Sequence, residues 1–141
     1  MRFKIKSPGC TSSANYKFWI LAKGENAGRP EYIERPNSFV VECDDKGSES
    51  RLYCIAFSLF TTGQFKALHV GSVVPFLRVG CVNKLLNQVV SNYPIDLLID
   101  DLMVKLVEVQ FQQENLLKQV GKLRQLEEAI AAKIIKGRGA L

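Results

Sequence analysis

The last third of the chain carries a seven-residue repeat of apolar positions. The first apolar position holds Leu102, Val109, Leu116, Leu123 and Ile130, and the second, four residues further on, holds Ile99, Leu106, Val120 and Ile134. Gln113 and Glu127 interrupt the second row. This spacing is typical of the two seam positions of a coiled coil. The pattern therefore predicts one long helix over residues 93–136, with Pro94 in its first turn.

The positions beside the two apolar rows indicate what this helix pairs with. Leu117 and Leu126 widen the apolar stripe, and few charges stand beside it that could select a different partner helix. We therefore expect self-association in two or more copies. The alternative is that the helix folds back onto its own chain and hides residues 97–109. Gly121 weakens the helix by about 1 kcal/mol and could mark a kink or a break.

Shorter patterns before this helix predict a small α+β head over residues 1–92. Residues 2–6 alternate between apolar and basic side chains, as a half-buried strand does. Ser12 or Ser13 can cap a helix that runs to about Lys23. Tyr16, Trp19 and Ile20 share one face of that helix, so Trp19 is expected to anchor the core of the head.

The rest of the head reads as two further strands and two further helices. Residues 38–43 and 73–79 are rich in β-forming side chains, although Pro75 restricts the second run to a sheet edge or a bulge. Residues 52–61 fit both a helical face and strand alternation. Ten residues exceed the usual strand length, which favours a helix. Residues 82–90 have regular helical spacing.

The charge of the chain permits contact with nucleic acid without demanding it. The formal net charge is +5, with a basic head, an acidic stretch over residues 93–114 and a basic C-terminal end. Trp19 or Tyr32 could stack on bases. The candidate nucleic-acid contacts in the head are Lys4, Lys6, Lys17, Lys23, Arg29 and Arg35.

The chain shows no catalytic signature, so we predict that it is not an enzyme and needs no cofactor or metal. Its four cysteines form no C-x-x-C pair, and His69 is the only histidine. His69 and Ser72 lie too close in sequence, without a third group, to indicate a nucleophile. Residues 24–30 contain two glycines that could cradle a phosphate, but they match no phosphate-binding motif and indicate a turn.

Membrane and export signals are also missing from the sequence. No apolar run approaches the ~18 residues of a membrane span, and the N-terminal residues lack the apolar core of a signal peptide. The cysteines are then expected to be reduced thiols in a cytoplasmic protein.

Three stretches of the head resemble a group of known proteins: residues 18–30, residues 36–40 and the sequence Gly-Ser-Val-Val-Pro-Phe at 71–76. They are similar to small uncharacterised proteins of phages and conjugative elements in gut Bacteroidales. The resemblance covers about residues 15–80 and leaves out the C-terminal helix. It implies a cytoplasmic, mobile-element setting and transfers no functional residue.

Together these patterns favour a non-enzymatic interaction or assembly protein that oligomerises through residues 93–136 and ends in a flexible tail, residues 137–141. Its expected partners are copies of itself and another protein of the same element. The alternative is a nucleic-acid-binding accessory protein that uses the basic residues of its head and tail.

Overall fold

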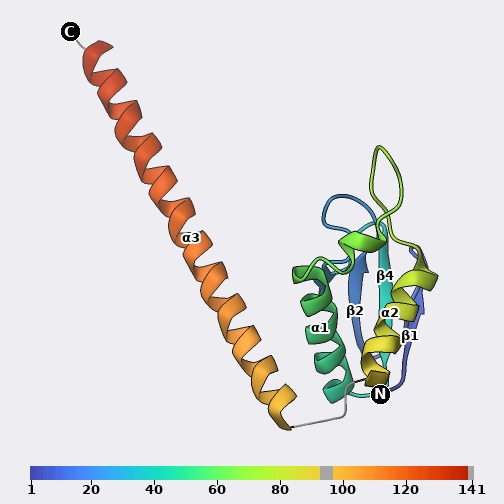
Figure 1. Cartoon of the computed structure of the whole chain (residues 1–141). Helices are drawn as coiled ribbons and strands as arrows, with labels where there is room; N and C mark the ends of the chain where they lie inside the picture. Colours follow the sequence, from blue (N-terminus) through green and yellow to red (C-terminus); the bar gives the residue numbers. More distant parts are fainter. Residues whose placement is uncertain (93–96, 140–141) are drawn as a thin grey trace. The chain divides into compact units, whose positions relative to one another are not determined.

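The protein combines an antiparallel sheet and two helices with one long C-terminal helix, so the predicted α+β class is confirmed (Figure 1). The computed structural model describes residues 1–92 and 97–139, and the side chains of residues 1–92 and 100–137. The chain divides into two units, Met1–Asp100 and Asp101–Leu141. Pro94, expected in the first turn of the long helix, lies outside the described residues.

The sheet of the first unit has four antiparallel strands in the order β1-β4-β2-β3. The strands are β1 (Phe3–Lys6), β2 (Tyr16–Leu21), β3 (Pro30–Glu31) and β4 (Ser38–Cys43). The predicted strands at residues 2–6 and 38–43 are therefore confirmed. The strand that comes last in the chain, β4, lies between β1 and β2. These two strands are therefore joined in the sheet only through β4.

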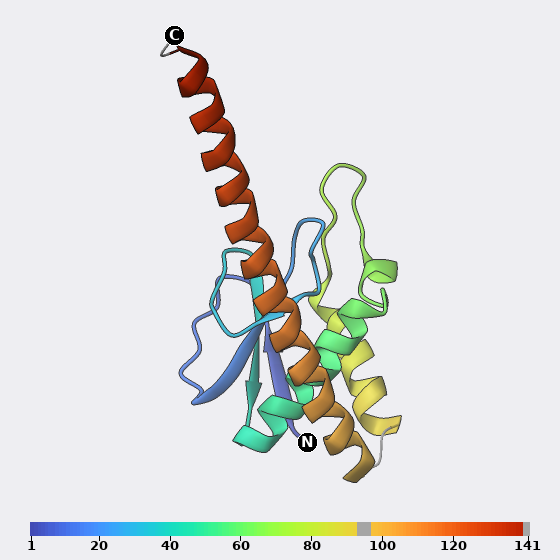
Figure 2. The ribbon, with the colours of Figure 1, turned by 90° about the vertical axis from the view of Figure 1, so that its left-hand side faces the viewer.

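Two helices cover one face of this sheet (Figure 2). They are α1 (Lys46–Thr61) and α2 (Val79–Asn92), and a short 3₁₀ helix, η1 (Lys66–Leu68), lies between them in the chain. The core forms where the two layers meet, and its fully buried side chains include Phe18, Ile20, Val41, Leu52 and Leu86. The predicted helices at residues 52–61 and 82–90 are confirmed.

The prediction of a helix up to Lys23 is wrong, because residues 16–21 form β2. Tyr16, Trp19 and Ile20 satisfy helical spacing, but Phe18 and Ile20 also alternate with half-exposed neighbours. The aromatic and β-branched residues of this segment suit a strand, and all six residues of β2 pair with β4. Phe18 and Ile20 are fully buried, whereas Trp19 is only partly buried. Trp19 therefore does not anchor the core.

The helix predicted at residues 52–61 begins six residues earlier than expected, at Lys46. Asp45 is its N-cap, and the Asp45 Oδ1 atom accepts a hydrogen bond of 2.8 Å from the Ser48 backbone N–H. Lys46 also pairs with the buried carboxylate of Glu49 at 2.8 Å. The chain therefore passes from β4 almost directly into the cap of α1. Gly63, with a φ of 78°, follows its end.

The strand predicted at residues 73–79 is also wrong. Within this run only Phe76 forms β-bridges, with Val70 and Lys23. The helix α2 already begins at Val79. Pro75 has no N–H to donate, and Val73 is 90% exposed, so the first half of this run has neither the hydrogen bonds nor the burial of a strand. Residues 70–76 form a projecting loop instead (Figure 1).

The turn predicted at residues 24–30 is a closely packed connection between β2 and β3. The Gly28 N–H donates to the Leu21 carbonyl at 2.7 Å, and the Gly28 backbone has a φ of 105°. A Cβ atom on Gly28 would lie 2.5 Å from the Phe65 Cβ, so only glycine fits there. This connection also leads the chain into Arg29 and Glu31 at the edge of the sheet.

The long helix α3 runs over Leu97–Gly139 and confirms the predicted long C-terminal helix. It continues through Gly121 without interruption and extends three residues beyond the predicted end at Lys136. At about 1.5 Å per residue, 43 residues span roughly 65 Å. No helix among the described residues combines the length and the apolar content needed to cross a bilayer.

Candidate functional site

The sheet has an outer face, opposite α1 and α2, where several of the predicted nucleic-acid contacts meet. Directly opposite residues of antiparallel strands point to the same side. Lys4 and Lys17 both lie opposite Glu42, and Lys6 and Trp19 both lie opposite Val40. The outer face, as we use the term, consists of Lys4, Lys6, Lys17, Trp19, Val40 and Glu42. Three of the six predicted basic contacts thus share one face of the sheet with Trp19.

Glu42 balances part of the positive charge on the outer face. Its carboxylate pairs with Lys6 at 2.9 Å and accepts a hydrogen bond from the Ser12 hydroxyl. These hydrogen bonds, from Ser12 first and then from Lys6, lower the pKa of Glu42 below its usual value. Lys4 is exposed and forms no ion pair with a described residue. The three lysines therefore keep a net positive charge on this face at neutral pH.

Lys17 and Trp19 are held next to each other on this face. The Lys17 ammonium donates to the Ser12 carbonyl at 2.8 Å, and its nitrogen lies 5.9 Å from the centre of the Trp19 ring. That distance is within the range of a cation–π contact. An aromatic surface and a cation are thus available side by side, without a helix of residues 1–92 covering them.

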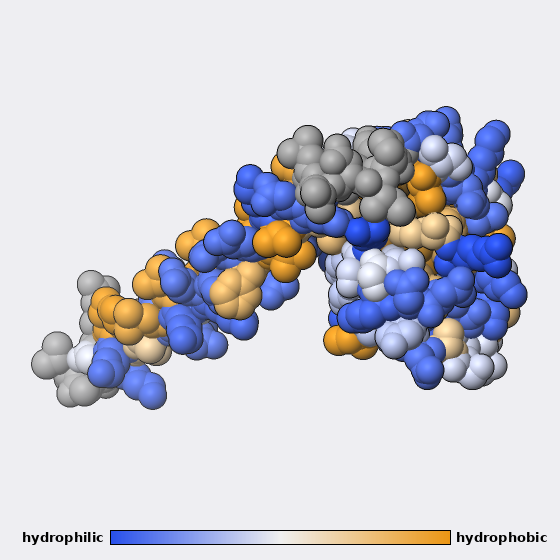
Figure 3. Space-filling view, turned by 90° about the horizontal axis from the view of Figure 1, so that it is seen from below, coloured by the Kyte–Doolittle hydropathy of each residue, from blue (hydrophilic) through white to orange (hydrophobic). Residues whose placement is uncertain are grey.

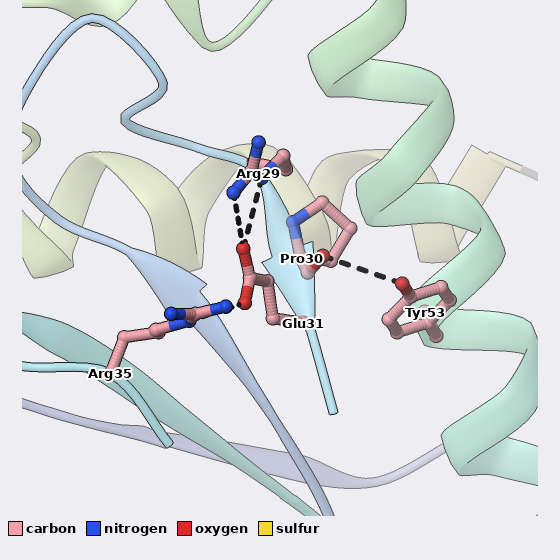
Figure 4. A network of polar contacts seen from close by, with 5 residues as sticks. All are labelled: Arg29, Pro30, Glu31, Arg35 and Tyr53. Carbon is pink, nitrogen blue, oxygen red and sulfur yellow. Dashed lines mark hydrogen bonds and ion pairs between the residues drawn. The ribbon is translucent and has the colours of Figure 1, made fainter. Parts of the chain in front are cut away.

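Arg29 and Arg35 are engaged in a network at the β3 edge of the sheet (Figure 4). Both guanidinium groups donate to Glu31: Arg29 Nε to Oε1 at 3.0 Å, and Arg35 Nε to Oε2 at 2.9 Å. Burial by itself raises the pKa of Glu31, but the hydrogen bonds from Arg35 and Arg29 outweigh it and lower the pKa overall. On the other side of β3, the Tyr53 hydroxyl donates to the Pro30 carbonyl at 3.3 Å.

This network gives Arg29 and Arg35 a structural role, and the Glu31 carboxylate offsets half of their combined charge. Lys23, the sixth predicted contact, is exposed two residues beyond β2, where its backbone pairs with Phe76. The structure therefore separates the six predicted contacts into the outer face, the Glu31 network and Lys23.

A groove of about 590 Å³ lies beside Trp19 on the outer face. Its floor includes Val40 and Ser38 of β4, and its walls come from the β1–β2 and β3–β4 connections through Cys10, Arg35 and Asn37. The volume falls within the ~300–1,000 Å³ typical of ligand pockets. Asn37, with a φ of 57°, turns the chain into β4 at the rim of the groove.

Ser38 has an unusual position in this groove. The residue is 7% exposed, and its hydroxyl oxygen is buried without a hydrogen-bond partner among the described residues. Buried hydroxyl groups in folded proteins are normally hydrogen-bonded. Sequence reasoning missed Ser38, because Ser38–Val41 reads as a continuous buried run and the groove depends on two connections far apart in the chain.

Cys43 lies in the core, and His69 makes a contact that holds two segments of the head together. Burial, followed by the nearby carboxylates Glu49, Asp44 and Asp45, raises the pKa of Cys43 to about 12, so this thiol stays protonated at neutral pH. The Nε2 atom of His69 lies 2.8 Å from the Ala27 carbonyl oxygen, which ties the 66–70 segment to the turn. Among the described residues, no cluster of three metal-ligating side chains occurs.

The glycine turn cannot cradle a phosphate in this conformation. Its backbone N–H groups are used within the protein: Gly24 donates to the Pro75 carbonyl at 2.8 Å, and Gly28 donates to Leu21. Arg29 N–H also donates internally, to the Asn26 carbonyl at 3.0 Å. A phosphate site needs such groups free and convergent.

The second candidate surface is the apolar stripe of α3, which we call the seam. Taken by itself, α3 exposes apolar side chains along its surface (Figure 3). Seven predicted seam residues are between 44% and 65% exposed: Leu102, Val109, Leu116, Val120, Leu123, Ile130 and Ile134. Leu106 is partly exposed, and the side chain of Ile99 lies outside the described residues. Helices of soluble proteins normally bury such a stripe.

Comparison with known proteins gives a family and no activity. No curated protein and no solved structure matches the chain. A family of unknown function, DUF6943, matches residues 7–133. The match extends well beyond the resemblance over residues 15–80 and, contrary to that resemblance, includes most of α3. The chain therefore belongs to DUF6943, a family of unknown function.

Proposed function

We propose that the protein is a non-enzymatic assembly protein whose α3 helices pair with one another and present the α+β heads. The observation that carries the proposal is the exposed seam of α3. Its leucines, isoleucines and valines repeat with the spacing that helix pairing requires over five heptads. The cytoplasm is the proposed location, and a phage or conjugative element, with another protein of that element as partner, is the proposed setting.

The size of the seam suits association of helices. Fully burying one such side chain is worth about 1.5–3 kcal/mol, and these side chains are about half exposed. Two seams of seven residues then give on the order of 10 kcal/mol, which is comparable with the ~4–15 kcal/mol that association costs. The exposed Leu117 and Leu126 beside the seam add apolar area, which favours more than two copies.

Gln113 and Glu127 bear on how the helices associate. Both occupy the second row of the seam, where a polar side chain lowers stability but selects register and copy number. The flanking positions contribute little to that selection, because their charges are mostly of one sign: Lys105 and Lys133 stand on one side of the seam. The apolar rows, and not the flanking charges, therefore carry the proposed pairing of identical helices, because like charges beside the seam repel one another.

A peptide covering residues 101–139 tests the proposal in the absence of the head. We expect its helicity and its melting temperature to rise with peptide concentration, because association stabilises only the helical form. Circular dichroism over a hundredfold concentration range measures both quantities. The matched control is the same peptide with Leu116→Asp and Leu123→Asp, which should show neither rise. Helicity that does not depend on concentration would mean that the seam binds the head or another protein.

A further inference from the structure

We infer that the outer face of the sheet binds single-stranded nucleic acid, with a base stacked on Trp19 and the phosphates held by Lys4, Lys6 and Lys17. The inference goes beyond assembly through α3 and does not depend on it. It starts from a juxtaposition that the sheet creates: β1 and β2 lie on either side of β4 and turn their lysines to the same side. No short motif of the sequence brings these residues together.

The aromatic ring is placed for stacking. Trp19 is only partly buried, and it borders the groove instead of filling the core. Proteins that bind single strands combine a positively charged surface with aromatic side chains on which bases stack. Every base has a flat face, so this contact requires no particular sequence. In duplex DNA or RNA the faces of the bases are covered by their neighbours and cannot reach Trp19.

The lysines are placed to contact the phosphates of a bound nucleic-acid strand. Lys4 and Lys6 alternate along the edge strand β1, and Lys17 lies across β4 from Lys4. Two carboxylates of the sheet point to this side: Glu42 pairs with Lys6, and Glu31, which lies opposite Trp19, is already paired with Arg29 and Arg35. Lys4 is exposed, and Lys17 contacts a neutral carbonyl and the Trp19 ring, so both charges can still attract phosphates.

The groove gives the base a second contact. The Ser38 hydroxyl is buried there without a partner among the described residues, and it can both donate and accept a hydrogen bond. A base that stacks on Trp19 carries polar atoms on its edge, and these atoms bond to the Ser38 hydroxyl once the groove opens to it, because the hydroxyl oxygen is closed to solvent in the free protein. An acidic peptide would satisfy the lysines, but it would bring neither a flat ring for Trp19 nor a polar edge for Ser38.

Trp19 is the only tryptophan of the chain, so its fluorescence reports on this site alone. We expect a thymidine oligonucleotide of about 15 nucleotides to quench that fluorescence in low salt. The quenching should weaken as salt rises, because each neutralised phosphate adds about 0.7 to the slope of log affinity against log salt. Duplex DNA of the same length, thymidine monophosphate and poly-glutamate serve as competing ligands and should quench far less.

Two double variants test the lysines. Lys4→Gln with Lys17→Gln should weaken binding at least tenfold and reduce the salt slope by about 1.4, the value for two contacts. Lys66→Gln with Lys84→Gln removes the same charge from exposed positions on η1 and α2 and should change neither quantity by more than twofold. Fluorescence anisotropy of a labelled oligonucleotide measures the affinity of all variants, and circular dichroism checks that they fold.

The inference is overturned by any of three results. The first is the absence of quenching in low salt. The second is equal loss of binding in the two double variants, which would indicate attraction by net charge alone. The third is equal quenching by poly-glutamate, the duplex or thymidine monophosphate, which would identify an acidic-peptide, duplex or free-nucleotide site instead. A Ser38→Ala variant adds a separate readout: it should weaken binding at least threefold without changing the salt slope, since it removes no charge.

Discussion

Replacing Leu116 and Leu123 together by Asp is expected to abolish self-association and to leave the head folded. The two leucines lie one heptad apart in the middle of the seam and are 57% and 65% exposed on α3 alone. In a helical assembly both carboxylates would be buried without partners at every contact between chains. The cost of burying an unpaired charge is several kcal/mol, compared with the ~1 kcal/mol of an average substitution. Light scattering should give the mass of one chain.

The matched control for this variant is Gln125→Asp with Ala132→Asp. These two residues are also one heptad apart and exposed, but they lie on the side of α3 that faces away from the seam. The control adds the same two charges to the same helix and should keep the mass of the unmodified protein. If both variants become monomeric, the added charge and not the seam is responsible. If the head of the first variant unfolds, the seam packs on the head.

Phe18→Ala is expected to lower the free energy of unfolding of the head by about 3–5 kcal/mol, as large buried aromatic residues do. Phe18 is fully buried, and its ring meets that of Tyr53 edge to face, with 5.5 Å between the ring centres. Urea unfolding followed by circular dichroism measures the change. The monomeric Leu116→Asp, Leu123→Asp background removes the dependence of stability on concentration.

Trp19→Ala is the neighbouring control for Phe18→Ala. Because Trp19 points to the outer face, its removal should cost less than half as much as that of Phe18. A larger loss of stability for Trp19→Ala than for Phe18→Ala would mean that Trp19, and not Phe18, points from β2 into the core. Such a result would also remove the basis for a stacking role of Trp19, since the ring would then be core.

The elements that local patterns determine could be predicted from the sequence. The heptads of α3 and the apolar face of α2 repeat within single helices, so their spacing is visible without knowledge of the fold. The early start of α1 also has a local signal, because Asp45 precedes Ser48 and Glu49 as an N-cap precedes its first turn.

The elements that depend on distant pairing could not be predicted in the same way. Residues 16–21 fit a helix and a strand equally well by spacing, and pairing with β4, about twenty residues further along, decides for the strand. The candidate site depends on this pairing. As a helix, this segment would place Trp19 in the core, whereas as a strand it places Trp19 beside Lys17 on the outer face. The groove beside Trp19 and Ser38 forms only when the β1–β2 and β3–β4 connections come together, and no motif of the sequence marks it.

The mass of the unmodified protein in solution tests the proposed assembly most directly. One chain has a mass of 15.8 kDa. Light scattering behind a sizing column, over a hundredfold range of concentration, should give a whole multiple of that mass, at least twice its value, at the upper concentrations. A mass of 15.8 kDa at every concentration would contradict assembly through α3.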